Sequence, residues 1–199
     1  MIVATLALLL ASANDDLVVR ARVDPFVTIV AGGASVGVDI AHRAHPVRVS
    51  AAAFVVDVPG LMVPLISRTD ASDLSLLIRE SCVQLGAFAS LSPEHRGFFI
   101  GPELYAYRLR YLDAAHPTRA AIAHELYAHA TAGFVWFPFS RGPGDHDNGI
   151  VDDVFVMPWA TVGIPVFGTG GVTFADDVVV NDRVVNFHAT ISIGLQLQP

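Results

Sequence analysis

The chain has 199 residues and a formal net charge of −7, and it is 53% hydrophobic but only 16% charged. Soluble domains average about 25% charged residues, so these few charges cannot cover an ordinary water-facing surface. The acidic balance argues against nucleic acid as a partner, which would call for a basic patch. The single cysteine, Cys82, excludes an internal disulfide and is interpreted as a buried thiol.

The N-terminal segment is interpreted as an export signal. Ile2–Leu10 is an apolar core too short to span a bilayer, and Ala11–Ala13 fits a cleavage site before Asn14. Residues 1–13 are therefore predicted to be a signal peptide and residues 14–199 a single domain. No basic residue precedes the apolar core, although export signals usually begin with one. A first β-strand, or a buried segment of a cytosolic protein, is the alternative.

Beyond this segment, apolar and polar residues alternate repeatedly, which is the pattern of strands with two unlike faces. Counting Val172–Val180 as a broken strand, we expect about eight strands. Val19–Ala31 also alternates, and the following Gly32-Gly33 either bends one long strand or closes a hairpin, so ten strands is the alternative. The clearest segments are Gly33–Ala41, Val47–Val55, Arg79–Ser90, Phe98–Arg110, Ala121–Trp136, Val151–Gly163 and Val185–Leu197.

The last of these segments alternates without a break. One face is apolar: Val185, Phe187, Ala189, Ile191, Ile193, Leu195 and Leu197. The other face is polar or small: Asn186, His188, Thr190, Ser192, Gly194, Gln196 and Gln198. A helix would scatter both sets around its circumference, so the segment is predicted to be a strand.

Alternation alone does not distinguish a membrane barrel from a soluble one whose apolar face points inward. Here the polar faces carry few charges, and the chain contains no lysine, whereas the outside of a soluble barrel is rich in lysine and glutamate. Aromatic residues gather near expected strand ends, where membrane interfaces lie: Phe98, Phe99, Phe134–Phe139, Trp159 and Phe187. The sequence therefore predicts an all-β, antiparallel up-and-down transmembrane β-barrel with a filled polar lumen.

Several stretches resemble small bacterial outer-membrane β-barrel proteins of the eight-stranded class. They are Gly97–Pro102, Gly133–Pro138, Val156–Trp159 and Ile191–Leu197. The resemblance implies a Gram-negative outer-membrane location, the lipid bilayer as partner, and a monomer. The chain departs from the class at its end, where Gln198-Pro199 stands in place of a terminal aromatic residue.

Two motifs approach metal sites without matching them. His124-Glu125 and His129 resemble a zinc protease motif, but the second histidine comes one residue late, and on a strand the two histidines face opposite ways. Asp145–Asp153 resembles a calcium loop, but its glycine comes early and no glutamate closes it, so a solvated turn is expected. Gly168–Gly171 lacks the lysine of a phosphate loop and is interpreted as a turn.

Some outer-membrane barrels are lipid hydrolases or acyltransferases, so a nucleophile and a base were sought. His188, Thr190 and Ser192 share one face, and Glu125 or Glu80 could orient the histidine. Alternate polar residues are also what any filled lumen contains. The sequence therefore assigns no catalytic, cofactor-binding or metal-binding residue.

The polar faces are expected to form a charge-compensated interior in which Arg48 contacts one or more acids. Its members are Asp39, Arg48, Glu80, Glu103, Glu125, His129 and His188. The first functional hypothesis is a non-enzymatic outer-membrane barrel with a structural or surface-interaction role. The alternatives are a membrane-embedded lipid hydrolase or acyltransferase, and a soluble secreted barrel that binds an apolar ligand, which needs the apolar face of Val185–Leu197 to point inward.

Overall fold

A computed structural model describes most of the chain after the predicted signal peptide, which itself lies outside the described residues. The described residues are 16–60, 63, 67–69, 76–92, 95–114, 118, 120–140, 153–168, 172–173, 179–182 and 186–197. No helix in this part of the chain is long and apolar enough to cross a membrane.

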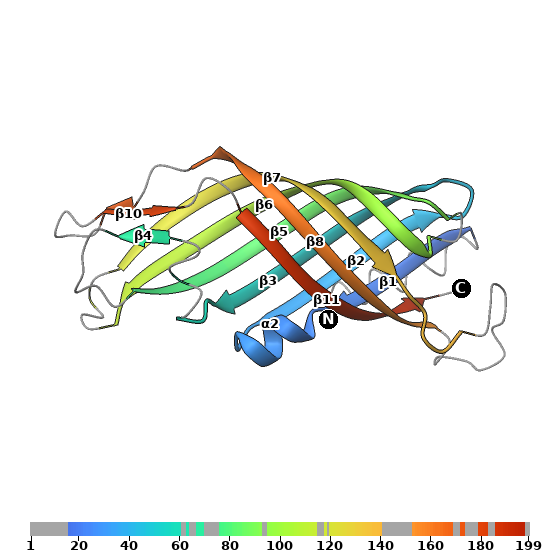
Figure 1. The fold of residues 1–199 in the computed structure, drawn as a ribbon, viewed down its shortest axis with the longest axis horizontal. Helices are drawn as coiled ribbons and strands as arrows, with labels where there is room; N and C mark the ends of the chain where they lie inside the picture. Colours follow the sequence, from blue (N-terminus) through green and yellow to red (C-terminus); the bar gives the residue numbers. More distant parts are fainter. Residues whose placement is uncertain are drawn as a thin grey trace.

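Eight antiparallel strands form one sheet that closes on itself (Figure 1). Around the sheet the order is β1-β11-β8-β7-β6-β5-β3-β2. Strands of this sheet that follow one another along the chain therefore lie side by side, and β11 pairs with β1 to close the sheet. The strands are β1 (Leu17–Val23), β2 (Ala34–His42), β3 (Val47–Asp57), β5 (Leu76–Ser90), β6 (Gly97–Asp113), β7 (Ala120–Val135), β8 (Val154–Phe167) and β11 (Asn186–Leu197).

The two ends of the closed sheet differ in their connections. One end, here called the turn end, carries the short β2–β3 and β5–β6 connections at residues 43–46 and 91–96. The opposite end, the loop end, carries helix α2 (Pro25–Val30) and a small sheet in the order β4-β10-β9 (Figure 1). The strands of that small sheet are β4 (Ser67–Thr69), β9 (Val172–Thr173) and β10 (Val179–Asp182).

The expectation of about eight strands is met, but one strand was assigned wrongly. Val172–Val180 does not join the closed sheet, because its described parts, β9 and β10, pair with β4 instead. The eighth strand is β1. The predicted strand Val19–Ala31 ends at Val23, after which Asp24 caps a short helix whose first residue is Pro25. Proline lacks a backbone donor and favours the first turn of a helix, and the Asp24 carboxylate accepts hydrogen bonds from the Phe26 and Val27 amides.

The outward positions of the strands are mostly apolar, whereas the inward positions hold the buried charged and hydroxyl side chains together with aromatic and other apolar residues. On β11, Ser192 is fully buried, whereas Phe187 and Ile191 are 70% and 50% exposed. The same division holds around the sheet, since inward residues pair only with inward residues in the register: Arg22 lies opposite Gly37, and Ser50 opposite Asp39. The soluble apolar-ligand barrel required the reverse orientation of Val185–Leu197, and the described part of that segment does not have it.

Candidate functional site

The outer surface of the closed sheet is an apolar belt. Its large side chains are between 39% and 60% exposed. They come from all eight strands of the closed sheet and include Val23, Val36, Val47, Val49, Val55, Val83, Leu85, Ile100, Leu104, Ile122, Val162, Ile164, Ile191, Ile193 and Leu195. A soluble monomer rarely exposes a continuous apolar surface of this kind, so the belt is a candidate interface.

Aromatic side chains border the belt, although only some of the expected ones do. Phe98 and Trp136 are 64% and 56% exposed at the turn end, and the Phe98 ring packs edge-on against Phe134 at 4.9 Å. Phe187 is exposed toward the loop end. The expectation was wrong for Phe99, Phe137 and Trp159, which are buried inside the closed sheet. These three residues occupy inward positions. The position of an aromatic residue near a strand end does not show whether its side chain points inward or outward.

The interior at the turn end holds two buried arginines among aromatic rings. Arg20 donates to Gln196 Oε1 at 2.9 and 2.8 Å, and its guanidinium lies 5.3 Å from the Phe137 ring. Arg48 lies 3.8 Å from the centre of the Phe99 ring and directs Nη2 toward Met157 Sδ at 3.6 Å. Cation–π contacts favour a desolvated guanidinium.

The expectation that Arg48 contacts an acid is therefore corrected. The contacts that the structure gives it are with Phe99, Phe88 and Met157. The close ion pair on Asp39 comes from Arg22, whose Nε lies 3.5 Å from Oδ1. Arg22 sits on β1 opposite the side-chain-free Gly37, so it has the room to reach Asp39.

A second polar group crosses the middle of the interior. Thr131 and Tyr105 donate to Glu103 Oε2, and the Thr131 hydroxyl lies 2.8 Å from that of Thr161. His129 Nδ1 lies 3.0 Å from Thr161 Oγ1, and the His129 imidazole stacks on Tyr105 with centroids 4.0 Å apart. This network pairs the Glu103, Thr131 and Thr161 oxygens, which would otherwise be costly away from water, whereas His129 Nε2 has no hydrogen-bond partner among the described residues.

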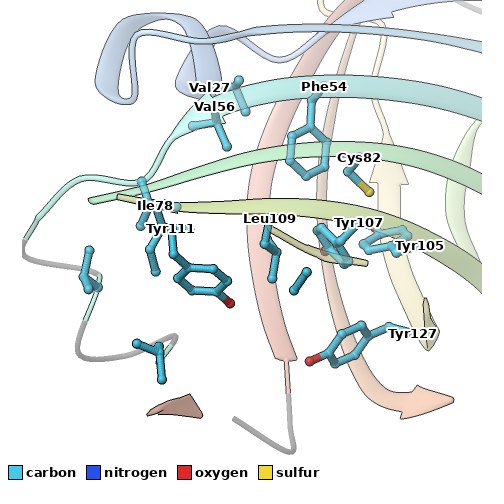
Figure 2. Close-up of a cluster of buried hydrophobic side chains, with 14 residues drawn as sticks. Val27, Phe54, Val56, Ile78, Cys82, Tyr105, Tyr107, Leu109, Tyr111 and Tyr127 are labelled. Carbon is cyan, nitrogen blue, oxygen red and sulfur yellow. The ribbon is translucent and has the colours of Figure 1, made fainter. Parts of the chain in front are cut away.

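Nearer the loop end, apolar and aromatic side chains fill the interior. Tyr105, Tyr107 and Tyr127 pack edge to face, with Tyr107 and Tyr127 centroids 5.7 Å apart (Figure 2). Cys82 is a free thiol buried among them, as the sequence predicted. Its neighbours in this cluster leave it no solvent access, which is the ordinary condition of a structural cysteine.

Glycines on the inward face stand opposite the largest side chains. A Cβ built on Gly163 would lie 2.4 Å from the His129 ring, and one on Gly133 would lie 2.4 Å from the Phe99 ring. The cross-strand pairs of this kind are Gly37 with Arg22, Gly86 with Glu103, Gly133 with Phe99, Gly163 with His129, and Gly194 with Phe155. Each glycine leaves room for the large side chain opposite it, and the interior is filled in this way.

The predicted interior residues all lie on inward positions. Asp39, Arg48, Glu103, Glu125 and His129 are buried, and Glu80 and His188 are half-buried. The set lacked Arg20 and Arg22, which are 2% and 8% exposed. Arg20, Arg22 and Asp24 alternate along the sequence, which indicates that they share one strand face. They were left out because Val19–Ala31 was counted only as an alternative strand.

In the structure, Ser192 and His188 each contact Trp159 rather than each other. Ser192 Oγ accepts from Trp159 Nε1 at 3.0 Å and from Arg22 Nη1 at 3.4 Å. His188 stacks flat on the Trp159 indole, with centroids 5.2 Å apart and planes 8° apart. His188 and Ser192 lie four residues apart on the inward face, which separates their Cα atoms by about 13 Å, too far for a hydrogen bond between their side chains. Thr190 occupies the inward position between them, and its Oγ1 has no hydrogen-bond partner among the described residues.

The metal-like motifs do not form a metal site in the described part of the chain. His124 is exposed on the outer surface while Glu125 and His129 are buried inside, so the strand separates them as predicted. No group of three or more His, Cys, Asp or Glu side chains there could hold a metal ion. Residues 145–152 of the calcium-like cluster, and most of Gly168–Gly171, lie outside the described residues.

Helix α2 covers a break in the wall of the closed sheet. β1 ends at Val23 opposite Ile193, whereas β11 extends back to Asn186, so the loop-end half of β11 has no β1 residue beside it. α2 occupies this place, and its one buried residue, Val27, packs with Phe54 and Val56 of the interior (Figure 2). A cavity of only about 20 Å³ lies beneath it, bordered by Arg22, Trp159 and His188 among others.

At the turn end, the β5–β6 connection inserts His95 into the closed sheet. His95 is 1% exposed and has a φ of 55°. Its Nδ1 lies 3.2 Å from Ser90 Oγ and its Nε2 3.3 Å from the His42 carbonyl oxygen, so Nε2 carries the proton and Nδ1 accepts from Ser90. Arg20 Nη1 donates to the His95 carbonyl at 2.8 Å. Burial lowers the pKa of this imidazole, and the charges of Arg20 and Arg48 act in the same direction.

We expect His95 to make stability fall in mild acid. Above the unfolded-state pKa of about 6.5 the imidazole is neutral in both states and its contribution is complete. As the pH falls below that value, the unfolded chain binds the proton before the folded protein does, and the free energy of unfolding declines until the lowered folded pKa is passed. Unfolding of the purified protein between pH 7.5 and pH 5, chosen to bracket about 6.5, measures this.

His95→Gln should reduce the slope of stability against pH, because it removes the titrating group. His45→Gln is the control, since it removes an exposed histidine from the neighbouring turn and leaves His95 in place. An unchanged slope in His95→Gln would contradict the assignment.

Comparisons with protein-family models, with curated proteins and with solved structures found no match.

Proposed function

We propose that the protein is a membrane-embedded β-barrel of the bacterial outer membrane with a structural or surface-interaction role. The observation that carries the proposal is the orientation of the closed sheet, with an exposed apolar belt outside and buried arginines, acids and hydroxyls inside. Pairing of β1 with β11 closes the sheet, and α2 covers the part of β11 that β1 leaves unpaired. Covered or paired strand edges are what a strand-built structure needs in lipid. Water would favour the opposite orientation.

The packed interior supports a role other than a diffusion pore. Aromatic rings, arginines and the His95 loop fill the turn-end half, and the tyrosine cluster fills the half near the loop end. A barrel of about eight strands has an interior just wide enough for side chains. The interaction role falls to the loop end, where the small β4-β10-β9 sheet lies outside the closed sheet.

Helix α2 fits the same proposal. Its apolar residues Phe26, Ile29 and Val30 are 46%, 81% and 53% exposed, although the helix is only six residues long. They face an open apolar groove of about 980 Å³ that continues onto the outer residues of β8 and β11, including Pro158 and Ile191. In a bilayer, lipid acyl chains supply the apolar surroundings that these side chains lack.

The two tryptophans provide a direct test, because one points outward and the other inward. Trp136 is 56% exposed at the edge of the belt and Trp159 is 8% exposed inside. After refolding into vesicles with lipids brominated near the carbonyl end of the acyl chains, we expect strong fluorescence quenching of Trp136 and little of Trp159. Trp159→Phe and Trp136→Phe leave one reporter each and serve as each other's control.

Equal, weak quenching of both tryptophans in a protein that floats free of the vesicles would overturn the membrane proposal. Slower migration of the boiled than the unboiled protein on a detergent gel gives an independent check that the closed sheet is folded before quenching is measured.

A further inference from the structure

Basic side chains gather on the outer surface just where the apolar belt ends toward the loop end. This basic band consists of Arg79 on β5, Arg108 and Arg110 on β6, and His124 on β7, all exposed. Their chain neighbours Ile78, Leu109, Tyr111 and Ala123 are buried, which fixes the band on the outer face.

The register brings these side chains together. Arg79 lies directly opposite Arg110, and Arg108 directly opposite His124. Directly opposite residues have Cβ atoms about 5 Å apart, and Arg108 and Arg110 are about 7 Å apart along one strand. The band is therefore a single surface patch drawn from three adjacent strands.

Only part of this charge is compensated within the described residues. Arg79 forms a two-pronged ion pair with Asp57 on β3, with Nη2 2.8 Å from Oδ2. The outward neighbours of Arg108 in the register are Ser81 and His124, and Arg110 has Arg79 and Ile122 beside it. Like charges placed opposite each other repel, so the band favours an added anion.

The height of the band matches a lipid headgroup region. The outward residues of β6 are uncharged from Phe98 through Ile100, Pro102, Leu104 and Ala106, and Arg108 comes next. Ten residues separate Phe98 from Arg108, a height of about 24 Å for a strand tilted by about 45°. The apolar band of membrane barrels is about 25 Å tall, so the first outward charge falls where hydrocarbon gives way to headgroups.

We propose that the basic band binds the phosphate of an anionic lipid in the leaflet at the loop end. This inference rests on the proposed membrane location. The forked guanidinium groups of Arg108 and Arg110 suit bidentate contact with phosphate oxygens. Leu104, four residues from Arg108 toward the turn end on the same outer face, contacts the lipid's acyl chains. Contact with both parts selects a whole lipid over a free anion.

The test is native mass spectrometry of the full chain in detergent, titrated with phosphatidylglycerol or phosphatidylcholine. We expect preferential binding of phosphatidylglycerol. The double variant Arg108→Gln/Arg110→Gln should weaken that binding about tenfold, since it removes charge-assisted hydrogen bonds, and leave phosphatidylcholine binding unchanged. Asp57→Asn should strengthen phosphatidylglycerol binding, because it frees Arg79.

Arg43→Gln is the control for a general loss of arginine charge, because Arg43 is exposed in the β2–β3 turn at the opposite end. Unchanged phosphatidylglycerol binding in the double variant would overturn the inference. Displacement of the lipid by an equal concentration of inorganic phosphate would assign the band to a free anion and overturn it as well. In either of these two outcomes, quenching of Trp136 by brominated lipid would mean that the protein is in the membrane but that the basic band is not a lipid site. Absence of Trp136 quenching would mean that the membrane proposal itself has failed.

Discussion

Leu85→Arg is expected to destabilise the lipid-embedded protein by about 2–4 kcal/mol, the cost of a charged residue on the lipid face near the bilayer midplane. Leu85 is 56% exposed on β5, between Ala51 and Leu104 of the neighbouring strands, and six residues from the outward Arg79. Reversible unfolding by urea in lipid vesicles measures the change in free energy.

Leu77→Arg is the matched control. It introduces the same charge on the same strand and the same face, but beyond Arg79 toward the loop end, where the cost should be about 0–1 kcal/mol. In water neither site is penalised, because an arginine on an exposed surface is well solvated. Equal, small effects at the two positions would therefore argue against lipid around the belt.

Asp39→Ala is expected to cost about 3–5 kcal/mol, the usual loss when one partner of a buried ion pair is removed. Asp39 is 2% exposed, and its negative charge acts on Arg20, Arg22 and Arg48 together. Without it, these buried guanidinium groups face one another with less compensation. The change appears as a lower urea midpoint with an unchanged dependence on urea concentration.

Asp57→Ala removes the same type of side chain from an exposed ion pair and is the comparison. The Asp57 and Arg79 side chains are 57% and 53% exposed, so the loss should stay within about 1 kcal/mol. Similar losses in Asp39→Ala and Asp57→Ala would show that the interior charges are solvated, contrary to the packed interior described above.

The sequence was sufficient to predict the strands in which apolar and polar residues alternate without a break. In Val185–Leu197 every apolar residue that the structure describes is outward, because alternate residues of a strand must point to opposite faces. The same parity placed Glu103, Glu125 and His129 inside. Periodicity is a local property, so it can be recognised without knowing which strands become neighbours.

What the sequence could not supply depends on contacts between distant segments. Arg48 was expected to meet an acid, but Phe99 and Phe88 come from strands that only the register brings beside it. The helix after Asp24 was missed because Val27 and Ile29 continue the apolar alternation of Ala21 and Val23, and Pro25 after a capping aspartate was not recognised as the start of a helix. The basic band was invisible for the same reason, since Arg79 and Arg110 are neighbours only through pairing.

Pairing of β1 with β11 has a kinetic consequence. The two strands that complete the circuit meet only through Val19–Val23 and Ile193–Leu197, from opposite ends of the described chain. Joining segments so far apart in sequence carries a large loop entropy, and proteins dominated by such contacts fold slowly. The hairpins from β5 to β8 can form from nearby residues first. The last event is then the arrival of β11 at β1, and a folding intermediate would be a curved, open sheet with those two edges exposed.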